Sequence, residues 1–202
     1  MRHKWYSDNR DLVKWATLVR LALKHHATIV WIWLLTDDEV GYTFAEPDTT
    51  DFPGEVIEHF RDLHDIDRLA ARAGIEVSHY RRPYQGDDDA YFDDVIAEVQ
   101  AGFQNSPDPV ILFVDPDTGL QPESGSTGAK HIHRDRVAQL YRALRPCDVL
   151  VLYQRKWRDK RWKTITTQRL AEALGCPPEE IQVFYSPVAA DVALFAHTKA
   201  DA

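Results

Sequence analysis

Three short apolar runs constrain the fold of this chain more than any other feature. They are TIVWIWLL (28–35), PVILFVD (109–115) and DVLVLYQ (148–154). Their apolar residues follow one another instead of alternating with polar ones, which is typical of strands that are covered on both faces. Segments with the apolar spacing of helices lie between them. The pattern predicts a mostly parallel sheet enclosed by two layers of helices.

The remaining segments complete an alternation of helix and strand. Apolar spacing predicts helices over 10–25, 54–73, 90–103, 134–144 and 165–174. Asp8 or Asn9 can cap the first helix, and Gly175 can end the last. Further strands are predicted at 75–80, 181–186 and 191–197, the last two joined by a short turn. We expect one α/β domain over 1–202, with a three-layer doubly wound sheet and an antiparallel C-terminal hairpin.

Composition excludes several classes of protein. Hydrophobic residues make up 44% of the chain, which argues against disorder. The longest apolar run covers 27–35, far short of the ~18–20 residues that a membrane helix needs. The first ten residues are polar, unlike a secretory signal, and Cys147 and Cys176 are too few to indicate a disulfide framework or a zinc site. We therefore expect a cytoplasmic protein without a membrane segment.

The net charge of −8 conceals one strongly basic segment, RKWRDKRWK (155–163), with six Lys or Arg residues. Arg155 and Lys156 could neutralise phosphate while Trp157 stacks on a base. The alternative is a solvated loop whose tryptophans cover the neighbouring helix. A nucleic acid or a nucleotide is therefore a possible partner.

Polar residues follow three of the predicted strands. Ligands bind beyond the carboxyl ends of the strands in sheets of this type. The residues at these ends are Thr36, Asp37 and Asp38 after the first run, Asp115, Pro116 and Asp117 after the second, and Gln154 to Lys156 after the third. We expect the three loops to meet at one cleft.

The chemistry of these residues leaves more than one interpretation open. Asp115 could bind a metal, accept a proton or accept a hydrogen bond from an amine, whereas Asp117 could serve only the turn. The acidic loop after the first strand would repel a phosphate but attract a cation. One hypothesis is therefore a divalent metal held by Asp37, Asp38, Asp115, Asp117 and His131. Alternatively, the segment around His131 leads into the next helix, with Lys130 exposed or in contact with phosphate.

Asp11 and Lys14 stand three residues apart, so on a helix they share a face. Near the cleft they could hold a ligand. On an exposed face they would form an ordinary ion pair worth about 0.5 kcal/mol or less.

Two of these segments resemble Rossmann-type methyltransferases. The opening SDNRDLVKWATLVRL (7–21) is similar to the first helix of the bacterial large-subunit rRNA adenine methyltransferase family. Asn9, Asp11 and Lys14 match its motif, with one residue fewer between the Asn and the Asp, and Trp15 stands in place of a histidine. The segment VDPDTG, which begins at 114, resembles the Asp-Pro-Pro-Tyr motif of that family and the strand-end Asp-Pro of three-Cys-motif partner proteins.

The resemblance implies a division of roles within the cleft. Asp115 and Pro116 would hold the amine of a nucleic-acid or nucleotide base, with Asp117 and Lys14 beside them. S-adenosylmethionine would bind near Asn9, Asp11, Thr36, Asp37 and Asp38, and Lys130, Arg155, Lys156 and Trp157 would contact the substrate.

This chain departs from that family at several positions. Asp117 and Thr118 replace the second proline and the aromatic residue, and no glycine-rich loop follows 28–35. The sequence thus predicts a methyltransferase-like enzyme with an atypical cofactor site. The alternatives are a metal-dependent phosphodiesterase or nuclease, and a binding module without activity.

Overall fold

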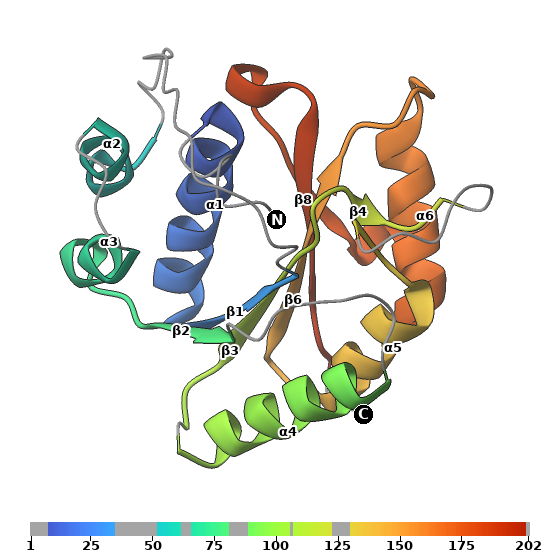
Figure 1. Cartoon of the computed structure of the whole chain (residues 1–202), viewed down its shortest axis with the longest axis horizontal. Coiled ribbons are helices and arrows are strands. Elements are labelled where there is room, and N and C mark those ends of the chain that lie inside the picture. Colours follow the sequence, from blue (N-terminus) through green and yellow to red (C-terminus); the bar gives the residue numbers. More distant parts are fainter. Residues whose placement is uncertain are drawn as a thin grey trace.

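The computed structural model describes residues 8–34, 52–61, 66–80, 89–105, 107–122 and 130–200. A six-stranded sheet lies between two layers of helices (Figure 1). Across the sheet the strands are β2 (Val77–Tyr80), β1 (Thr28–Trp33), β3 (Val110–Asp115), β6 (Val149–Arg155), β8 (Val192–Thr198) and β7 (Gln182–Phe184). Within the described chain, only β8 runs against the other strands of this sheet. The predicted mostly parallel sheet with antiparallel C-terminal strands is therefore confirmed.

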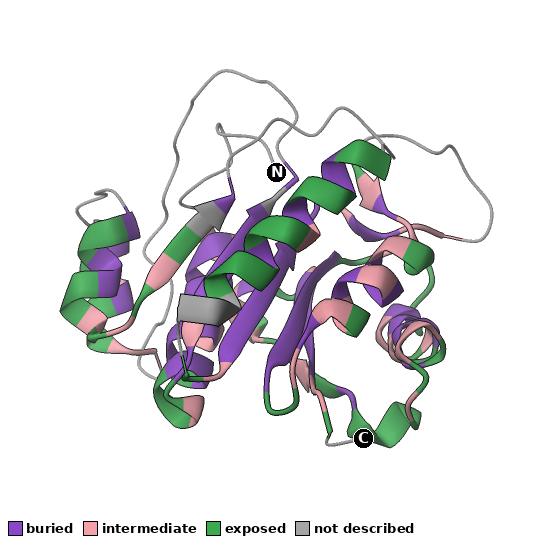
Figure 2. Cartoon of the chain, turned by 90° about the horizontal axis from the view of Figure 1, so that it is seen from below, coloured by how far each residue is buried: buried purple, intermediate pink, exposed green. Residues whose placement is uncertain are grey.

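Alternating side chains of the strands build one core on each face of the sheet. Ile111 and Phe113 of β3 pack with one layer of helices, which consists of α1 (Asn9–His25), α2 (Gly54–Arg61) and α3 (Ile66–Ala73). Leu112 and Val114 pack with the other layer, which consists of α4 (Asp89–Asn105), α5 (Arg134–Ala143) and α6 (Trp162–Leu174). The central strands are buried on both faces (Figure 2), as their continuous apolar runs predict.

Helix α1 begins and ends where its sequence predicts. The Asp8 side chain caps it by accepting hydrogen bonds from the backbone N–H groups of Arg10 and Asp11. His26 ends it in the left-handed conformation, with φ of 51°. The helix precedes β1 and runs against it, so its first turns lie at the edge of the sheet where β1, β3 and β6 end. We call this the carboxyl edge, and the opposite one the amino edge.

Several predicted boundaries need correction. The single helix expected over 54–73 is described as the two helices α2 and α3. Helix α6 begins at Trp162 rather than at 165, because Trp162 is buried and packs in the core. The turn between β7 and β8 contains the 3₁₀ helix η3 (Pro187–Ala189), and another, η2 (Pro178–Glu180), precedes β7.

A small second sheet was not predicted from the sequence. Strands β4 (Gly119–Leu120) and β5 (His131–Ile132) pair in parallel beside the carboxyl edge. Strands of two residues have no periodicity that a sequence could show. Within the described ranges, no helix combines the length and the apolar character needed to cross a membrane.

Candidate active site

A buried lysine lies between two aspartates at the carboxyl edge. Asp115 is the last residue of β3, and its side chain lies on the α1 face because it follows the alternation of Ile111 and Phe113. The Lys14 ammonium of α1 donates hydrogen bonds to Asp11 Oδ1 at 2.8 Å and to Asp115 Oδ2 at 2.9 Å. Asp11 and Lys14 are each 3% exposed and Asp115 is 1% exposed. The interpretation of Asp11 and Lys14 as an exposed ion pair is therefore wrong, because both side chains are buried.

The surroundings of Lys14 keep its side chain charged. Burial alone would lower the pKa of Lys14, but the negative charges of Asp11 and Asp115 outweigh it and raise that pKa. The ammonium also lies 4.7 Å from the centre of the Tyr153 ring. Burial raises the pKa of Asp11 to about 6, against the opposing effect of Lys14. Burial likewise raises the pKa of the Tyr153 phenol, which is therefore neutral.

The two oxygens of Asp115 have different environments. Oδ2 accepts hydrogen bonds from Lys14 and, at 3.2 Å, from the indole N–H of Trp31. Trp31 is held by an edge-to-face contact with Trp15, with ring centres 4.8 Å apart. Oδ1 is buried and has no hydrogen-bond partner in the described part of the chain. A buried carboxylate oxygen without a donor is costly, so its position indicates a place for a donor from a ligand.

A cavity of about 290 Å³ opens at this cluster, close to the lower end of the volumes of small-molecule sites. It carries side chains of both charges. The residues that line it are Asp8, Arg10, Asp11, Lys14, Asp115, Pro116, Asp117, Lys130, Tyr153 and Arg155. Such a lining suits a small polar ligand that brings both hydrogen-bond donors and a negative group.

Asp191 holds the outer side of the cavity together. The Arg10 guanidinium donates to Asp191 Oδ2 from Nη2 at 2.8 Å and from Nε at 3.0 Å, and to Asp8 at 2.7 Å. Burial works to raise the pKa of Asp191, but the hydrogen bonds and charge of Arg10 outweigh it and lower that pKa. Arg155 Nε lies 3.8 Å from the same carboxylate. One carboxylate thus orients two of the cations that line the cavity.

The structure brings together most of the residues that the sequence selected. Lys14, Asp11, Asp115, Pro116, Asp117, Lys130 and Arg155 all line the cavity. Asn9, Lys156 and Trp157 are described but are not among its lining residues. Thr36, Asp37 and Asp38 lie outside the described residues.

Trp157 has a packing role in this structure. It is partly buried against the core beside α6, and the Arg169 guanidinium lies 5.2 Å from its ring centre. The second tryptophan of the basic segment, Trp162, is fully within the core. Trp157 therefore packs beside α6, whereas Trp162 belongs to α6 itself.

His131 takes part in a local network rather than in a cluster of carboxylates. It lies on β5, and its Nδ1 is 2.8 Å from the Thr118 hydroxyl. Burial lowers its pKa. Among the residues with described positions, Asp115, Asp117 and His131 form no group able to hold a metal. Asp115 is paired with Lys14, and the other two carboxylates of the predicted metal site, Asp37 and Asp38, lie outside the described residues.

The Gln154 side chain stabilises the turn after Asp115. It accepts a hydrogen bond from Leu120 N–H at 2.8 Å and donates one to the Thr118 carbonyl at 3.0 Å. Gly119 has φ of 112°, and a Cβ atom there would overlap the Gln154 side chain. The glycine of the DPDTG segment is therefore required by the close approach of Gln154.

Sequence reasoning missed Asp8, Arg10, Trp31 and Tyr153 as parts of the site. The alternation of side chains along β6 could have revealed Tyr153, which shares the α1 face with Val149 and Val151. The contact of Arg10 with Asp191 spans 181 positions, so no local pattern shows it.

Comparisons of this chain with protein families, with characterised proteins and with solved structures find no match. The interpretation of the site therefore depends on its geometry and on the chemistry of its side chains.

Proposed function

We propose that this protein is a methyltransferase-like enzyme that methylates an amine of a nucleotide or of a nucleic-acid base. The observation that carries the proposal is the unpaired Oδ1 of Asp115, which is buried at a cavity while Oδ2 is held by Lys14 and Trp31. A carboxylate fixed in this way accepts an N–H of an amine and thereby orients the nitrogen lone pair.

The arrangement of elements supports this proposal. The cation of the site comes from the helix before β1, and the carboxylate comes from the end of β3, in the two segments that resemble the methyltransferase motifs. The reversed last strand, β8, also suits a sheet of that family.

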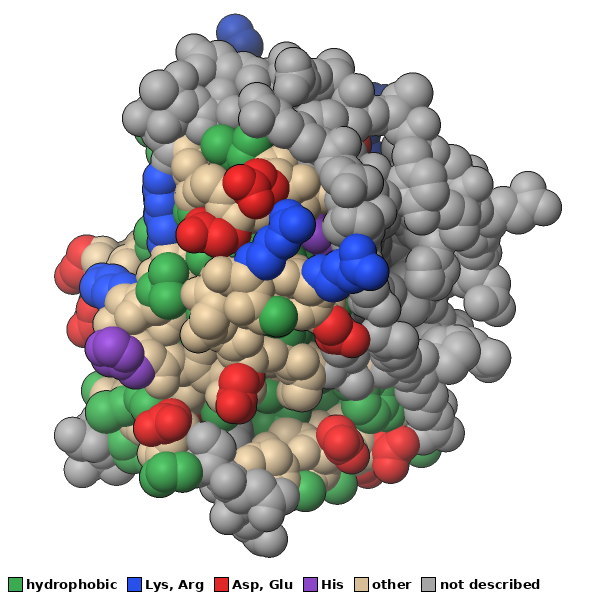
Figure 3. All heavy atoms as spheres, turned by 90° about the vertical axis from the view of Figure 1, so that its left-hand side faces the viewer, with side chains coloured by type: hydrophobic (Ala, Val, Ile, Leu, Met, Phe, Trp, Pro, Cys, Tyr) green, Lys and Arg blue, Asp and Glu red, His purple; other side chains and the backbone are tan. Residues whose placement is uncertain are grey.

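The residues have separate tasks in this mechanism. Asp115 accepts the N–H of the amine, and Lys14 keeps the Asp115 side chain in position from the α1 side. Lys130 and Arg155 face the cavity, where they can contact a phosphate of the substrate. On the face drawn in Figure 3, the described acidic and basic side chains are interspersed and form no broad basic patch. Phosphate contact is assigned to Lys130 and Arg155 of the cavity.

S-adenosylmethionine would supply an electrophilic methyl group on a positively charged sulfur. Asp8 and Asp11 line the cavity, where they are paired with Arg10 and Lys14. The resemblance adds Asn9, Thr36, Asp37 and Asp38 to this side of the site. The described residues thus fit the amine side through Asp115, and the cofactor side follows from the resemblance.

Isothermal titration with S-adenosylmethionine, followed by transfer of a labelled methyl group to a panel of nucleotides and RNA, tests the proposal. We expect saturable binding and labelling of an amine. Asp115→Asn should lower the rate by about 10²–10³-fold, because it removes the charged acceptor. Asp135→Asn, an exposed site on α5, is the matched control and should have no effect. Absence of heat and of labelling would refute methyl transfer and favour a binding module.

A further inference from the structure

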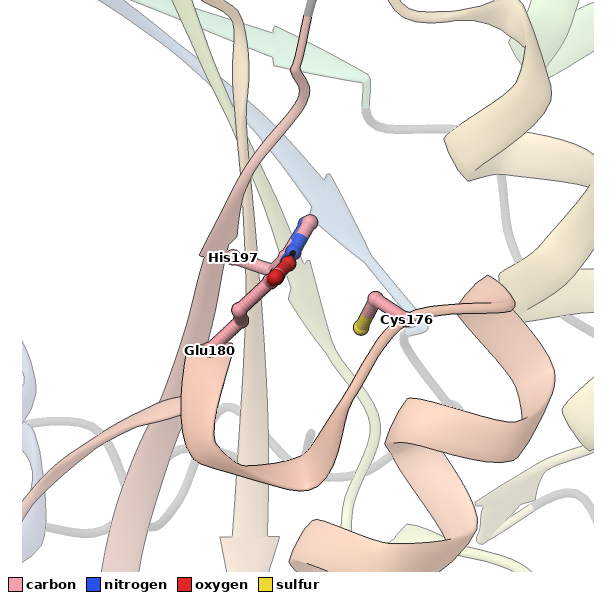
Figure 4. A group of neighbouring side chains, drawn as sticks. All are labelled: Cys176, Glu180 and His197. Atoms are coloured by element: carbon pink, nitrogen blue, oxygen red, sulfur yellow. Dashed lines mark hydrogen bonds and ion pairs between the residues drawn. The ribbon is translucent and has the colours of Figure 1, made fainter.

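A second group of chemically active side chains lies at the amino edge of the sheet. Cys176 follows α6, Glu180 ends η2 and His197 lies on β8 (Figure 4). The sulfur, one carboxylate oxygen and one imidazole nitrogen lie within 4.8 Å of one another. His197 is paired with Leu150 near the start of β6, so this group lies at the end of the sheet opposite to the cavity of Asp115.

The orientation of His197 is fixed by its neighbours. Its Nδ1 lies 2.9 Å from the Tyr141 hydroxyl, and its Nε2 lies 3.2 Å from Glu180 Oε2. A histidine that binds a metal through one nitrogen usually donates its other N–H to an oxygen. With Nδ1 directed at Tyr141, Nε2 is the nitrogen directed toward Glu180 and Cys176.

The backbone carries these three side chains on ordered elements. The Cys176 N–H donates to the Ala171 carbonyl at 3.1 Å, where α6 ends at Gly175. Glu180 N–H donates to the Pro177 carbonyl at 3.1 Å. His197 is held within β8, which is hydrogen-bonded to β6 and β7 on its two sides. The group is therefore assembled before any ligand arrives.

We propose that Cys176, Glu180 and His197 form a binding site for a zinc-type transition-metal ion. Zinc bonds to sulfur, nitrogen and oxygen of about 2.0–2.3 Å place tetrahedral ligands roughly 3.3–3.8 Å apart, so small side-chain rotations suffice. A thiolate with an imidazole favours zinc over magnesium or calcium, which prefer oxygen alone. Glu180 is about half exposed, with a relative side-chain area of 53%, which leaves room for water as the fourth ligand.

Metal binding would also change the protonation of Cys176. A cysteine thiol ordinarily carries its proton at neutral pH. The ion would displace that proton and bind the thiolate, so its affinity should increase as the pH rises. The site would tie the loop after α6 to β8.

Cobalt titration of the reduced, chelator-treated full chain tests the proposal. We expect one equivalent of Co²⁺ to produce a thiolate charge-transfer band and the visible bands of a tetrahedral ion, and Zn²⁺ to displace them. Cys176→Ser should abolish the charge-transfer band. Cys147→Ser is the matched control, because Cys147 is the other free cysteine and is exposed, and it should keep the band.

Two further variants separate ligands from packing. Glu180→Gln changes an exposed side chain, and it should weaken Co²⁺ binding about tenfold or more with the fold intact. Tyr141→Phe removes the partner of His197 Nδ1 and should weaken binding by about 10–100-fold. Circular dichroism verifies that each variant is folded. Lack of a saturable band in the wild type, or equal spectra for wild type and Cys176→Ser, would refute the site.

Discussion

Two buried aspartates at opposite edges of the same sheet have opposite environments. Asp115 ends β3 at the carboxyl edge and is 1% exposed, whereas Asp148 precedes β6 at the amino edge and is 0% exposed. Each Asp148 oxygen accepts two hydrogen bonds, among them those from the backbone N–H groups of Val110 and Arg145 at 2.8 Å. Asp115 uses only one oxygen in the described structure; its other oxygen is buried without a partner, in a residue that lines the cavity.

The difference shows how a structural carboxylate can be distinguished from one prepared for a ligand. Asp148 satisfies donors of its own chain and joins the loop before β6 to the start of β3. Asp115 is held through one oxygen by Lys14 and Trp31, and its other oxygen is buried without a partner in the described structure. The two residues are almost equally buried, so burial does not distinguish a structural carboxylate from a ligand-binding one. The informative quantity is the number of hydrogen bonds that each carboxylate already accepts.

Lys14→Met should have the largest effect on stability. It leaves the carboxyl groups of Asp11 and Asp115 buried without their cation, which costs about 3–5 kcal/mol in free energy of unfolding. Arg145→Met is the counterpart at the amino edge. It should cost about 1–2 kcal/mol, because the Arg145 side chain is about one-third exposed and Asp148 keeps its backbone donors. Urea denaturation measures both values, and equal losses would contradict the comparison.

Asparagine substitutions should affect the two aspartates in opposite ways. Asp148→Asn should cause the larger loss of stability, and Asp115→Asn the larger loss of ligand affinity. Asp148→Asn should cost about 2–3 kcal/mol, because an amide N–H₂ would face N–H donors. Asp115→Asn should cost about 1 kcal/mol, because the N–H₂ can occupy the unpaired position while the remaining oxygen still accepts from Lys14 and Trp31.

Ligand affinity should show the reverse order for the same pair, with a loss in Asp115→Asn and none in Asp148→Asn. Chemical denaturation and calorimetric titration of both variants check the inversion. A larger stability loss at Asp115 than at Asp148 would show that Oδ1 has a donor in the folded chain.

Gly119→Ala tests the turn that follows Asp115. The added methyl group would collide with Gln154, and a φ of 112° is strained for alanine, so we expect a loss of about 2 kcal/mol. Gly102→Ala on the exposed surface of α4 is the control. It meets no neighbouring atom and should stabilise the protein by about 0.5–1 kcal/mol. Thermal unfolding of both variants provides the measurement, and an unchanged melting temperature for Gly119→Ala would exclude the close contact with Gln154.

The last prediction concerns the pH response of the carboxyl edge. Burial raises the folded-state pKa of Asp11 to about 6, above the value of about 3.9 in an unfolded chain. The contribution of Asp11 to stability is therefore full below pH 4 and is lost as the pH rises through 6. The unfolding free energy of the wild type minus that of Asp11→Asn should fall by up to about 1 kcal/mol per pH unit between pH 4 and 6. A difference that stays constant over this range would contradict the raised pKa.

The sequence predicts the fold far better than it predicts the site. Apolar runs and the cap at Asp8 depend on neighbouring residues, so the strands and α1 were predicted nearly at their observed bounds. The pairing of Lys14 with Asp115 joins two elements separated by 101 positions, and it was not predicted; the sequence only placed both residues in one cleft. Local patterns do not show contacts of this kind, because folding brings the groups together.

The same limit applies at the amino edge. The two cysteines alone do not indicate a metal site, and the structure places Cys176 beside Glu180 and His197 instead of beside Cys147. The three proposed ligands come from the loop after α6, from η2 and from β8, so they have no fixed spacing in the sequence. Only the positions of the elements reveal it.

The long sequence separation of the contacts around the cavity has a consequence for biosynthesis. The contact between Arg10 and Asp191 can form only after Asp191, 181 residues further along the chain, has been synthesised. The outer side of the cavity cannot close before that. A ribosome that has produced α1, β1 and β3 has therefore made Lys14 and Asp115 but not yet the residue that orients Arg10 and Arg155. Closing such long loops is slow compared with forming helices. Binding competence should consequently be gained only after Asp191 has been synthesised, and nascent chains should acquire structure before they can hold a ligand.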